Sequence, residues 1–242
     1  MTEYYSTDLA LKISAIALNL KTPNSLQGVY IEAGANDGIT QNNTYLLEKS
    51  GWSGFLIEPS PIAYQELVKN RPNNRNYNVA LTSSNEIRKI AGTFTTGSLM
   101  ASADVSLKYR DHKPTNRLVL QFRNFLGLKN KISLLDVPAT TISEILIQNK
   151  VDSVDIFVLD VEGYELEVLK GMGEFRPRIL IVETQENDTF SLCELLLSFG
   201  YVLVRNLSEF NIVENPGWSE DHQDYAWALA SDKSAITAIL NL

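Results

Sequence analysis

Cysteine and histidine are scarce in this sequence. Among its 242 residues are one cysteine, Cys193, and two histidines, His112 and His222. A single cysteine excludes an intramolecular disulfide, and so few Cys and His side chains cannot supply the ligands of a structural zinc site. No apolar run approaches the length of about 20 residues that spans a bilayer. Glu3 and Asp8 lie where a secretory signal peptide would be basic. We therefore expect a soluble, cytoplasmic globular protein.

Positive charge is also in short supply. There are 21 Lys and Arg residues against 29 Asp and Glu residues, which gives a formal net charge of −8. Nucleic-acid binding depends on Lys and Arg that neutralise phosphates, so this balance argues against a nucleic-acid partner. However, residues 105–131, here called the basic segment, hold seven basic residues and one acid, so they carry +6 and the other 215 residues carry −14. The basic segment predicts either an anionic small-molecule partner or a solvated loop.

Short apolar runs alternate with helical periods along most of the chain. The runs with the composition of strands are Gly28–Ala33, Gly54–Glu58, Asn76–Leu81, Ile156–Asp160, Arg178–Glu183, Tyr201–Arg205 and Tyr225–Ala230. The helical segments between them are Asn43–Ser50, Ile62–Asn70, Thr141–Asn149, Glu165–Lys170 and Phe190–Ser198. This alternation predicts an α/β fold with a mostly parallel sheet of seven strands. Turn residues at 215–217 predict that the last two strands form a C-terminal antiparallel hairpin.

A chain of this length fits one α/β domain, which we expect over residues 1–242. Residues 8–20 predict an N-terminal helix with Asp8 as its N-cap. This helix is apolar nearly all round, so it should be buried in the fold or against a second subunit of a homodimer. Residues around 97–135 do not follow the alternation of strands and helices and predict a cap or insertion on the sheet.

The first predicted strand runs into a glycine-containing turn at residues 31–38 (IEAGANDG). Ligands of open α/β sheets bind beyond the carboxyl ends of the strands, and the first βα turn is the usual place for a nucleotide-like cofactor. Gly34 and Gly38 allow a tight turn and the close approach of a ligand. The dinucleotide fingerprint requires glycines at the positions of Asn36 and Ile39, which disfavours a NAD-dependent oxidoreductase. A P-loop motif is absent from the sequence.

The second predicted strand ends in an acid, Glu58. A carboxylate at this point of an α/β sheet accepts hydrogen bonds from the hydroxyls of a ribose. Together with the glycine turn, Glu58 favours a nucleoside-containing cofactor over a turn that is only structural.

Several short blocks follow one another in an order that is specific as a set. They are residues 31–38 (IEAGANDG), 51–59 (GWSGFLIEP), 78–81 (NVAL), 137–141 (VPATT), 159–165 (LDVEGYE) and 200–201 (GY). In these blocks the chain resembles the FkbM-type methyltransferases, which depend on S-adenosylmethionine (SAM). The resemblance covers roughly residues 28–205 and leaves out the N-terminal helix, the basic segment and the C-terminal strands.

The resemblance implies a Rossmann-like class I methyltransferase sheet and a role for each matching residue. The residues that would form the loop around SAM are Glu32, Gly34, Asn36 and Gly38, with Asp37 beside it. Glu58 would bind the ribose, and Asn78 and Ala80 would lie near the adenine. Asp160 would lie next to the methyl group that is transferred.

Methyl transfer to a hydroxyl requires a base or a metal, because the pKa of an alcohol is far above neutral. The candidate residues are Asp160, Glu162, Glu183, His112 and His222. Asp160 and Glu183 end neighbouring predicted strands, so their carboxyl groups are expected to converge and either hold Mg²⁺ or share a proton. Alternatively, one binds the SAM amine and the other caps a helix. Glu162 either points at the site or caps the next helix.

Each histidine has two interpretations. An imidazole titrates near neutral pH, so His112 in the basic segment and His222 in an acidic stretch are candidate bases. Both also fit solvated surface residues.

The leading hypothesis is a SAM-dependent O-methyltransferase that acts on a hydroxyl of a sugar or a secondary-metabolite-like small molecule. The oxygen acceptor is what the resemblance implies. The same residues fit a catalytically inactive SAM-binding module that serves as a partner or scaffold, and a NAD-dependent oxidoreductase is a third alternative. In the leading hypothesis, the basic segment covers the acceptor as a lid and favours an anionic, phosphate-bearing molecule.

Overall fold

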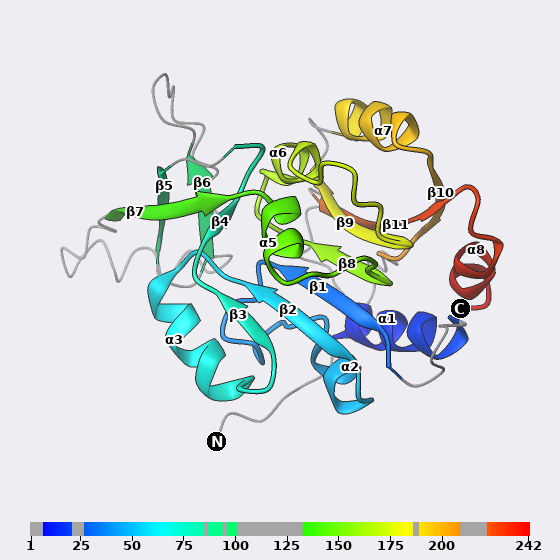
Figure 1. Cartoon of the computed structure of the whole chain (residues 1–242), viewed down its shortest axis with the longest axis horizontal. Helices are drawn as coiled ribbons and strands as arrows, with labels where there is room; N and C mark the ends of the chain where they lie inside the picture. The colour runs from blue at the N-terminus through cyan, green and yellow to red at the C-terminus, as the bar shows by residue number, and fades with distance from the viewer. Residues whose placement is uncertain are drawn as a thin grey trace, which may run out of the picture.

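The structure is a computed structural model that describes residues 7–20, 27–84, 87–93, 96–100, 133–185, 189–208 and 222–242. In these ranges the chain forms a central sheet with helices on both faces and a smaller sheet beside it (Figure 1). The basic segment, with His112, lies outside the described residues.

The central sheet has seven strands in the order β10-β11-β9-β8-β1-β2-β3. The strands are β1 (Val29–Ala33), β2 (Ser53–Ile57), β3 (Arg75–Tyr77), β8 (Ile156–Leu159), β9 (Ile179–Gln185), β10 (Tyr201–Asn206) and β11 (His222–Leu229). Neighbours from β3 to β9 pair in parallel, whereas β11 lies antiparallel between β9 and β10. The prediction of a mostly parallel seven-stranded sheet with C-terminal antiparallel strands is therefore confirmed.

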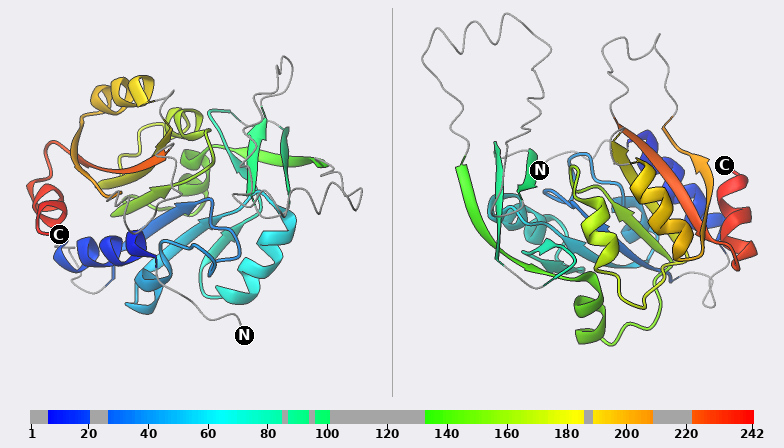
Figure 2. Two further views of the ribbon diagram at one scale, coloured as in Figure 1. Left: turned by 180° about the vertical axis from the view of Figure 1, so that it is seen from behind. Right: turned by 90° about the horizontal axis from the view of Figure 1, so that it is seen from above.

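The helices divide between the two faces of this sheet (Figure 2). They are α1 (Asp8–Asn19), α2 (Tyr45–Lys49), α3 (Pro61–Asn70), α5 (Ile142–Gln148), α6 (Glu165–Lys170), α7 (Thr189–Ser198) and α8 (Lys233–Leu240). The apolar side chains of α1, α2, α3 and α8 join one buried cluster, and those of α5, α6 and α7 join the other. All four residues of β8 are buried, as its continuous apolar run predicts for a strand covered on both faces.

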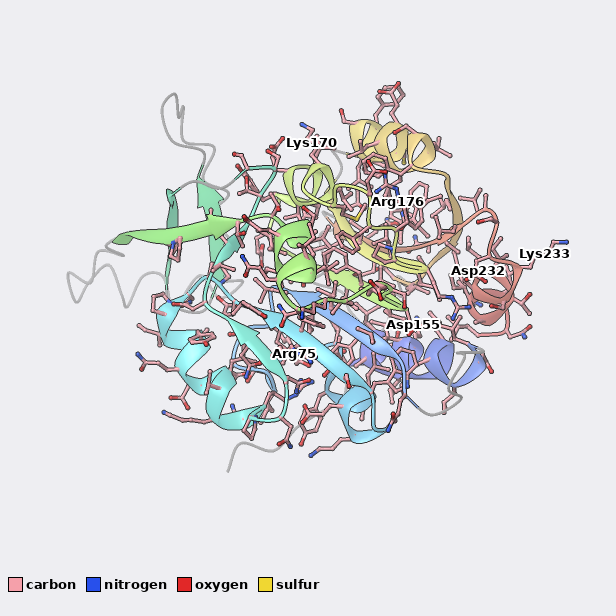
Figure 3. The ribbon with its side chains drawn as sticks, in the orientation of Figure 1. Arg75, Asp155, Lys170, Arg176, Asp232 and Lys233 are labelled. Carbon is pink, nitrogen blue, oxygen red and sulfur yellow. The ribbon has the colours of Figure 1, made fainter. Side chains whose placement is uncertain are left out.

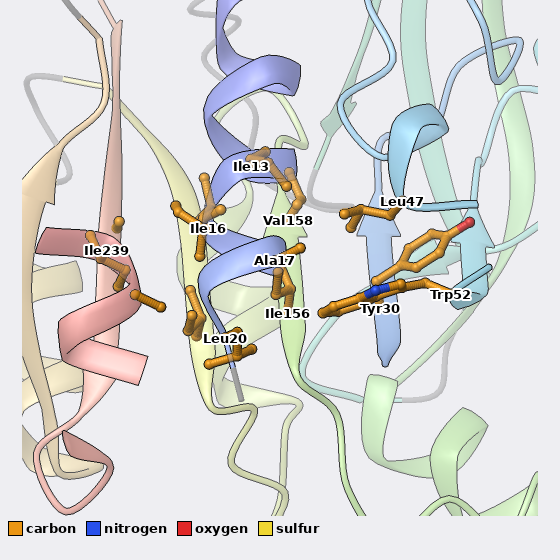
Figure 4. Close-up of a cluster of buried hydrophobic side chains, with 14 of the residues drawn as sticks. Ile13, Ile16, Ala17, Leu20, Tyr30, Leu47, Trp52, Ile156, Val158 and Ile239 are labelled. Carbon is orange, nitrogen blue, oxygen red and sulfur yellow. The ribbon is translucent and has the colours of Figure 1, made fainter. Parts of the chain in front are cut away.

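Helix α1 is buried in the fold along one face. Ile13 and Ile16 are fully buried between the sheet and α8 (Figure 4), whereas Leu18 on the opposite face is 80% exposed. The N-cap is Thr7, whose Oγ1 accepts a hydrogen bond from the backbone of the first turn. The prediction of Asp8 as the cap was wrong by one residue, and Asp8 instead begins the helix.

One predicted strand is divided in two. The sequence predicts a single strand over residues 76–81, but β3 ends before Asn78, and β4 (Ala80–Leu81) belongs to the smaller sheet. The Nδ2 atom of Asn78 donates to the carbonyl oxygens of Glu58 at 2.8 Å and of Pro59 at 3.1 Å. These bonds tie the crossing between the sheets to the end of β2.

The smaller sheet has the order β4-β7-β5-β6. Its other strands are β5 (Ile87–Thr93), β6 (Thr96–Met100) and β7 (Ser133–Thr140), which the sequence analysis does not predict, and α8 is a further element that it misses. The predicted cap at 97–135 begins in β6 and ends in β7, and its residues 101–132 lie outside the described part of the chain. Among the described helices, none has the length and apolar character needed to cross a membrane.

Candidate cofactor and catalytic site

Four neighbouring strands of the central sheet reach one level near their carboxyl ends. Strands β1, β2 and β8 end there, whereas β9 continues to Gln185, two residues beyond the predicted end at Glu183. Ala33 of β1 is in register with Ile57 of β2 and Leu159 of β8, and Leu159 is in register with Val182 of β9. The residues that follow these four positions are Gly34, Glu58, Asp160 and Glu183. The sheet thus brings together four residues that the sequence predicts for cofactor binding or catalysis. Their place is the carboxyl edge, where open α/β sheets bind ligands.

Gly34 lies directly against the end of β8. Its φ of +88° is in the left-handed region, and a Cβ atom there would lie 1.8 Å from the carbonyl oxygen of Asp160. The amide of Gly34 donates to the carbonyl of Ile57 at 3.0 Å, so the turn is tied to β2 as well. The absence of a side chain at Gly34 therefore lets the first loop cross the tip of β8.

Gly38 adopts the tight turn that the sequence predicts, but its missing side chain leaves room for packing within the protein. Its φ is +78°, and a Cβ atom would lie 2.6 Å from Cγ of Arg71 and 2.7 Å from Cδ1 of Leu67. The space beside this glycine is filled by the protein's own side chains. The prediction that Gly38 makes room for a ligand is wrong for the Cβ side, which packs against α3 and the residue after it.

Asp37 and Asn36 shape the loop from within. The carboxylate of Asp37 accepts hydrogen bonds from the amides of Ile39 at 2.9 Å and Thr40 at 2.6 Å and from the Thr40 hydroxyl at 2.8 Å. Asn36 has a φ of 50°, which an asparagine adopts more readily than most residues. Asp37 therefore stabilises the turn beside the predicted SAM loop.

Glu58 connects the ends of β1 and β2. Its side chain is 8% exposed and accepts hydrogen bonds from the amides of Asn36 at 2.9 Å and Ser60 at 2.7 Å. Burial raises the pKa of Glu58 to about 7, although these two hydrogen bonds act in the opposite direction. A carboxylate has about four acceptor sites, so the ionised group keeps capacity for ribose hydroxyls.

Glu32 anchors the far end of the same loop. It is 2% exposed and accepts hydrogen bonds from Asn42 Nδ2 at 2.8 Å, the Asn43 amide at 2.9 Å and Thr44 Oγ1 at 2.5 Å. Burial raises the pKa of this carboxyl group, and its hydrogen bonds oppose the shift. The contacts of Glu32 are thus with the loop itself, which indicates that Glu32 stabilises the conformation of this loop.

The two residues predicted near the adenine differ in exposure. Ala80 is fully buried and pairs with Ala139 on β7, in a small cluster that includes Val137. Asn78 is partly exposed and holds the backbone after β2.

Asp160 and Glu183 form a hydrogen-bonded pair of carboxyl groups. Burial raises the pKa of both groups, and the neighbouring acids Glu162 and Asp224 raise it further. A hydrogen bond between two carboxyl groups requires a proton on one of them. The pair therefore fits the shared-proton alternative that the sequence leaves open.

The predicted magnesium site is not supported. Among the residues that the structure describes, no three His, Cys, Asp or Glu side chains are grouped to hold a metal ion. Asp160 and Glu183 interact with each other, and no third ligand joins them among the described residues.

The loop after Asp160 is held in an unusual conformation. Glu162 has a φ of 59° and Gly163 a φ of 93°. The buried carboxylate of Glu165 accepts hydrogen bonds from the amides of Val161 at 3.0 Å and Gly163 at 3.1 Å. Glu165 thus holds the loop that precedes α6, and no side chain in the described part of the chain caps the N-terminus of this helix, so the predicted capping role of Glu162 is not observed. A non-glycine residue with positive φ is typical of functional sites, where the surrounding structure compensates for the strain.

Two site residues escape the sequence analysis. Asp224 on β11 is in register with Glu183 and contributes to the raised pKa of the carboxyl pair. The only signal for Asp224 is its place directly before the last predicted strand. Arg71, the residue after α3, is fully buried below the first loop, although isolated arginines usually lie at the surface. Of the predicted histidines, His222 begins β11 in register with Gln185, and the structure describes only its backbone.

Comparison with known families identifies this arrangement. The family model of the methyltransferase FkbM domain matches residues 32–203. The chain belongs to the FkbM methyltransferase family. A search of curated protein sequences finds no match. The FkbM assignment confirms the resemblance seen in the sequence blocks and identifies the chain as a SAM-dependent methyltransferase.

Solved structures are similar to the FkbM chain in fold. The human methyltransferase 10 domain containing protein has a TM-score of 0.50 and 13% identity, over 94% of this chain and 84% of that chain. A TehB-like SAM-dependent methyltransferase from Corynebacterium glutamicum has a TM-score of 0.46 and 11% identity, over 94% and 89% of the two chains. At 13% identity, the human protein supports the Rossmann-like methyltransferase fold and nothing finer.

The described residues of the FkbM chain fit the SAM that this fold implies. The loop at Gly34 brings backbone groups to the carboxyl edge without a side chain on its inner bend. Glu58 lies one strand away with acceptor capacity for a ribose, and Asp160 lies at the next strand tip on the other side. An acceptor for the ribose on one side of β1 and an acid on the other side suit a nucleoside joined to a charged amino acid.

Proposed function

We propose that this chain is an O-methyltransferase that transfers the methyl group of SAM to a hydroxyl of a sugar or a secondary-metabolite-like small molecule. The observation that supports the oxygen acceptor is the carboxyl pair of Asp160 and Glu183 beside Gly34. An alcohol must lose its proton as the new bond forms, and general bases work best when their pKa lies near the working pH. Carboxyl groups with ordinary pKa values are weak bases, whereas this pair has raised values.

The proposed cofactor residues follow from the strand tips. SAM supplies an electrophilic methyl group on a positively charged sulfur when it is bound. The loop from Gly34 to Gly38 holds the methionine part, and Glu58 accepts the ribose hydroxyls. Asn78 fixes the backbone after Glu58, so it positions the ribose-binding carboxylate and the adenine end together.

The proposed catalytic residues hold and accept a proton. The ionised member of the pair Asp160–Glu183 takes the proton of the acceptor hydroxyl, and the protonated partner stabilises it through their hydrogen bond. Glu162, held in its left-handed conformation by the loop, adds negative charge that keeps the pair basic. The reaction then needs mainly the alignment of the hydroxyl with the methyl group, which the rigid strand tips provide.

A screen of hydroxylated acceptors with methyl-labelled SAM tests this proposal. Free sugars, nucleotide-linked sugars and phenolic small molecules are compared, and the methylated atom is located by NMR. We expect Glu183→Gln to lower kcat at least a hundredfold, which is the usual contribution of a general base. Glu66→Gln on the exposed face of α3 is the matched control and should retain activity.

Two outcomes contradict the proposal in different ways. A protein that binds SAM but methylates no acceptor supports the inactive SAM-binding module. A product methylated at nitrogen or carbon contradicts the hydroxyl acceptor but agrees with methyltransferase activity.

We further propose that the acceptor is anionic, on the strength of the basic segment in the sequence. Its test is the triple variant Lys108→Gln, Arg110→Gln and Lys113→Gln. The loss of three charges near an anion should raise the acceptor KM about tenfold, since each exposed pair contributes about 0.5 kcal/mol. An unchanged KM would indicate a solvated surface segment.

A further inference from the structure

Arg71 lies fully buried beneath the first loop of the site. Its Nη1 atom donates to the carbonyl oxygen of Gly38 at 3.1 Å and to Asn42 Oδ1 at 2.9 Å. Its Nη2 atom donates to the hydroxyl of Tyr30 at 2.7 Å, and its Nε atom donates to the carboxylate of Glu48. The guanidinium is thus surrounded by acceptors, and the charge of Glu48 compensates its burial.

These contacts reach both ends of the loop that follows β1. Gly38 closes the turn that begins at Gly34. Asn42 passes the contact on, because its Nδ2 atom donates to Glu32 at 2.8 Å and to the carbonyl oxygen of Ala35 at 3.2 Å. One guanidinium group therefore holds Gly38, at the end of the turn, and Asn42, in the segment that leads to α2.

The stem of the arginine and its neighbour add to this support. Cγ of Arg71 occupies the space next to Gly38 in which a side chain would lie. The aliphatic stem of Arg71 therefore limits how closely the loop approaches α3. The preceding residue, Asn70, donates from Nδ2 to the carbonyl oxygen of Asp37 at 2.9 Å. Two successive residues at the end of α3 thus hold two successive carbonyl groups of the loop.

We propose that Arg71 is a positioning residue for SAM, which holds the loop from Gly34 to Gly38 in the conformation that binds the cofactor. The inference rests on the proposed function only in naming SAM as the ligand. A guanidinium suits this role because it offers five donors in a fixed planar fork. Lysine carries the same charge on a similar stem but cannot bond to Gly38, Asn42 and Tyr30 with the same geometry.

The test compares SAM affinity in Arg71→Lys with that of the wild-type protein by calorimetry. We expect the Kd for SAM to rise about tenfold or more, because the variant loses bonds to charged donors. The KM for SAM should rise by a similar factor, while kcat at saturating SAM and the KM of the acceptor stay within about twofold.

Arg178→Lys is the matched control, because Arg178 joins two acids at the opposite edge of the sheet. Its guanidinium bonds to Asp155 at 3.0 Å and to Asp232 at 2.6 Å, and Figure 3 labels both acids. The control should lose thermal stability and keep the wild-type Kd for SAM. Equal weakening of SAM binding in both lysine variants would show that the loss of affinity follows from lower overall stability. That result would overturn the inference.

If Arg71→Lys does not fold, Tyr30→Phe tests the contact between Arg71 and Tyr30 with a smaller change to the core. It removes one acceptor of Arg71 and keeps the shape of the core, and we expect the Kd for SAM to rise about threefold. An unchanged Kd in a folded variant overturns the inference. A wild-type protein that binds SAM but transfers no methyl group contradicts the proposed function. It does not affect this inference, because the test compares only affinities for SAM.

Discussion

The carbonyl oxygen of Asp160 lies 1.8 Å from the point that a Cβ atom on Gly34 would occupy. The first loop and the tip of β8 are therefore built as one unit, with no space between their backbones. This contact places the predicted methionine-binding turn directly beside the predicted base. In the proposed mechanism, cofactor binding and proton removal therefore depend on the same few backbone atoms.

The first prediction concerns this contact. Gly34→Ala should destabilise the protein by more than about 3 kcal/mol, since the new methyl group meets backbone atoms that cannot move alone. Gly200→Ala is the control, because Gly200 has a similar φ of +86° but nothing within 4 Å of its Cβ position. The control should cost about 1 kcal/mol, the strain of a left-handed residue. Urea unfolding measures both, and equal losses would remove the steric explanation.

The second prediction concerns the pH dependence of stability. Burial and neighbouring acids raise the pKa values of Asp160 and Glu183, so above pH of about 4 the folded chain holds more protons than the unfolded chain. Stability from this pair is therefore highest at acidic pH and falls as the pH rises through neutrality. At pH 8 the unfolded chain releases the proton that the folded pair retains, which lowers the stability of the wild-type protein. Glu183→Gln removes this titrating group and should stabilise the protein at pH 8 by about 1–2 kcal/mol.

Chemical unfolding between pH 5 and pH 9 measures this effect. The Glu183→Gln variant should show a shallower fall in the free energy of unfolding than wild type. A variant with the wild-type slope would show that the pair does not hold an extra proton. Glu66→Gln should keep the wild-type slope, because Glu66 is exposed on α3.

The third prediction concerns SAM affinity and Glu58. Its pKa of about 7 means that roughly a tenth of the protein has an ionised Glu58 at pH 6. If the ionised form binds the ribose, the Kd for SAM should be up to about tenfold weaker at pH 6 than at pH 8. Glu58→Gln should lower affinity by about 1–3 kcal/mol at pH 8 and flatten this dependence. Calorimetry across this range measures both, and a flat wild-type profile contradicts the role of Glu58.

The fourth prediction concerns metal dependence. Because Asp160 and Glu183 bond to each other, methyl transfer should survive treatment with EDTA within about twofold of the untreated rate. Added Mg²⁺ should leave the rate unchanged. Loss of activity in EDTA and its recovery with Mg²⁺ would contradict this prediction and favour Asp160 and Glu183 as metal ligands.

Much of the site follows from the strand pattern. Apolar runs that end in Gly34, Glu58, Asp160 and Glu183 predict parallel strands, and parallel strands in one sheet place their carboxyl ends together. The division of the predicted strand 76–81 does not follow, because Asn78 at the break bonds to the backbone after β2, which is distant in the sequence. Local propensity carries no information about such a partner.

The sequence by itself determined the α/β class, the parallel centre of the sheet and the set of residues at its carboxyl edge, because these depend on local periodicity and on the position of an acid or glycine after each strand. Only the tertiary structure decided why Gly34 and Gly38 are glycines, that the two carboxyl groups share a bond, and that Arg71 is buried below the loop. Each of these depends on atoms brought together from distant parts of the chain, which no local pattern records.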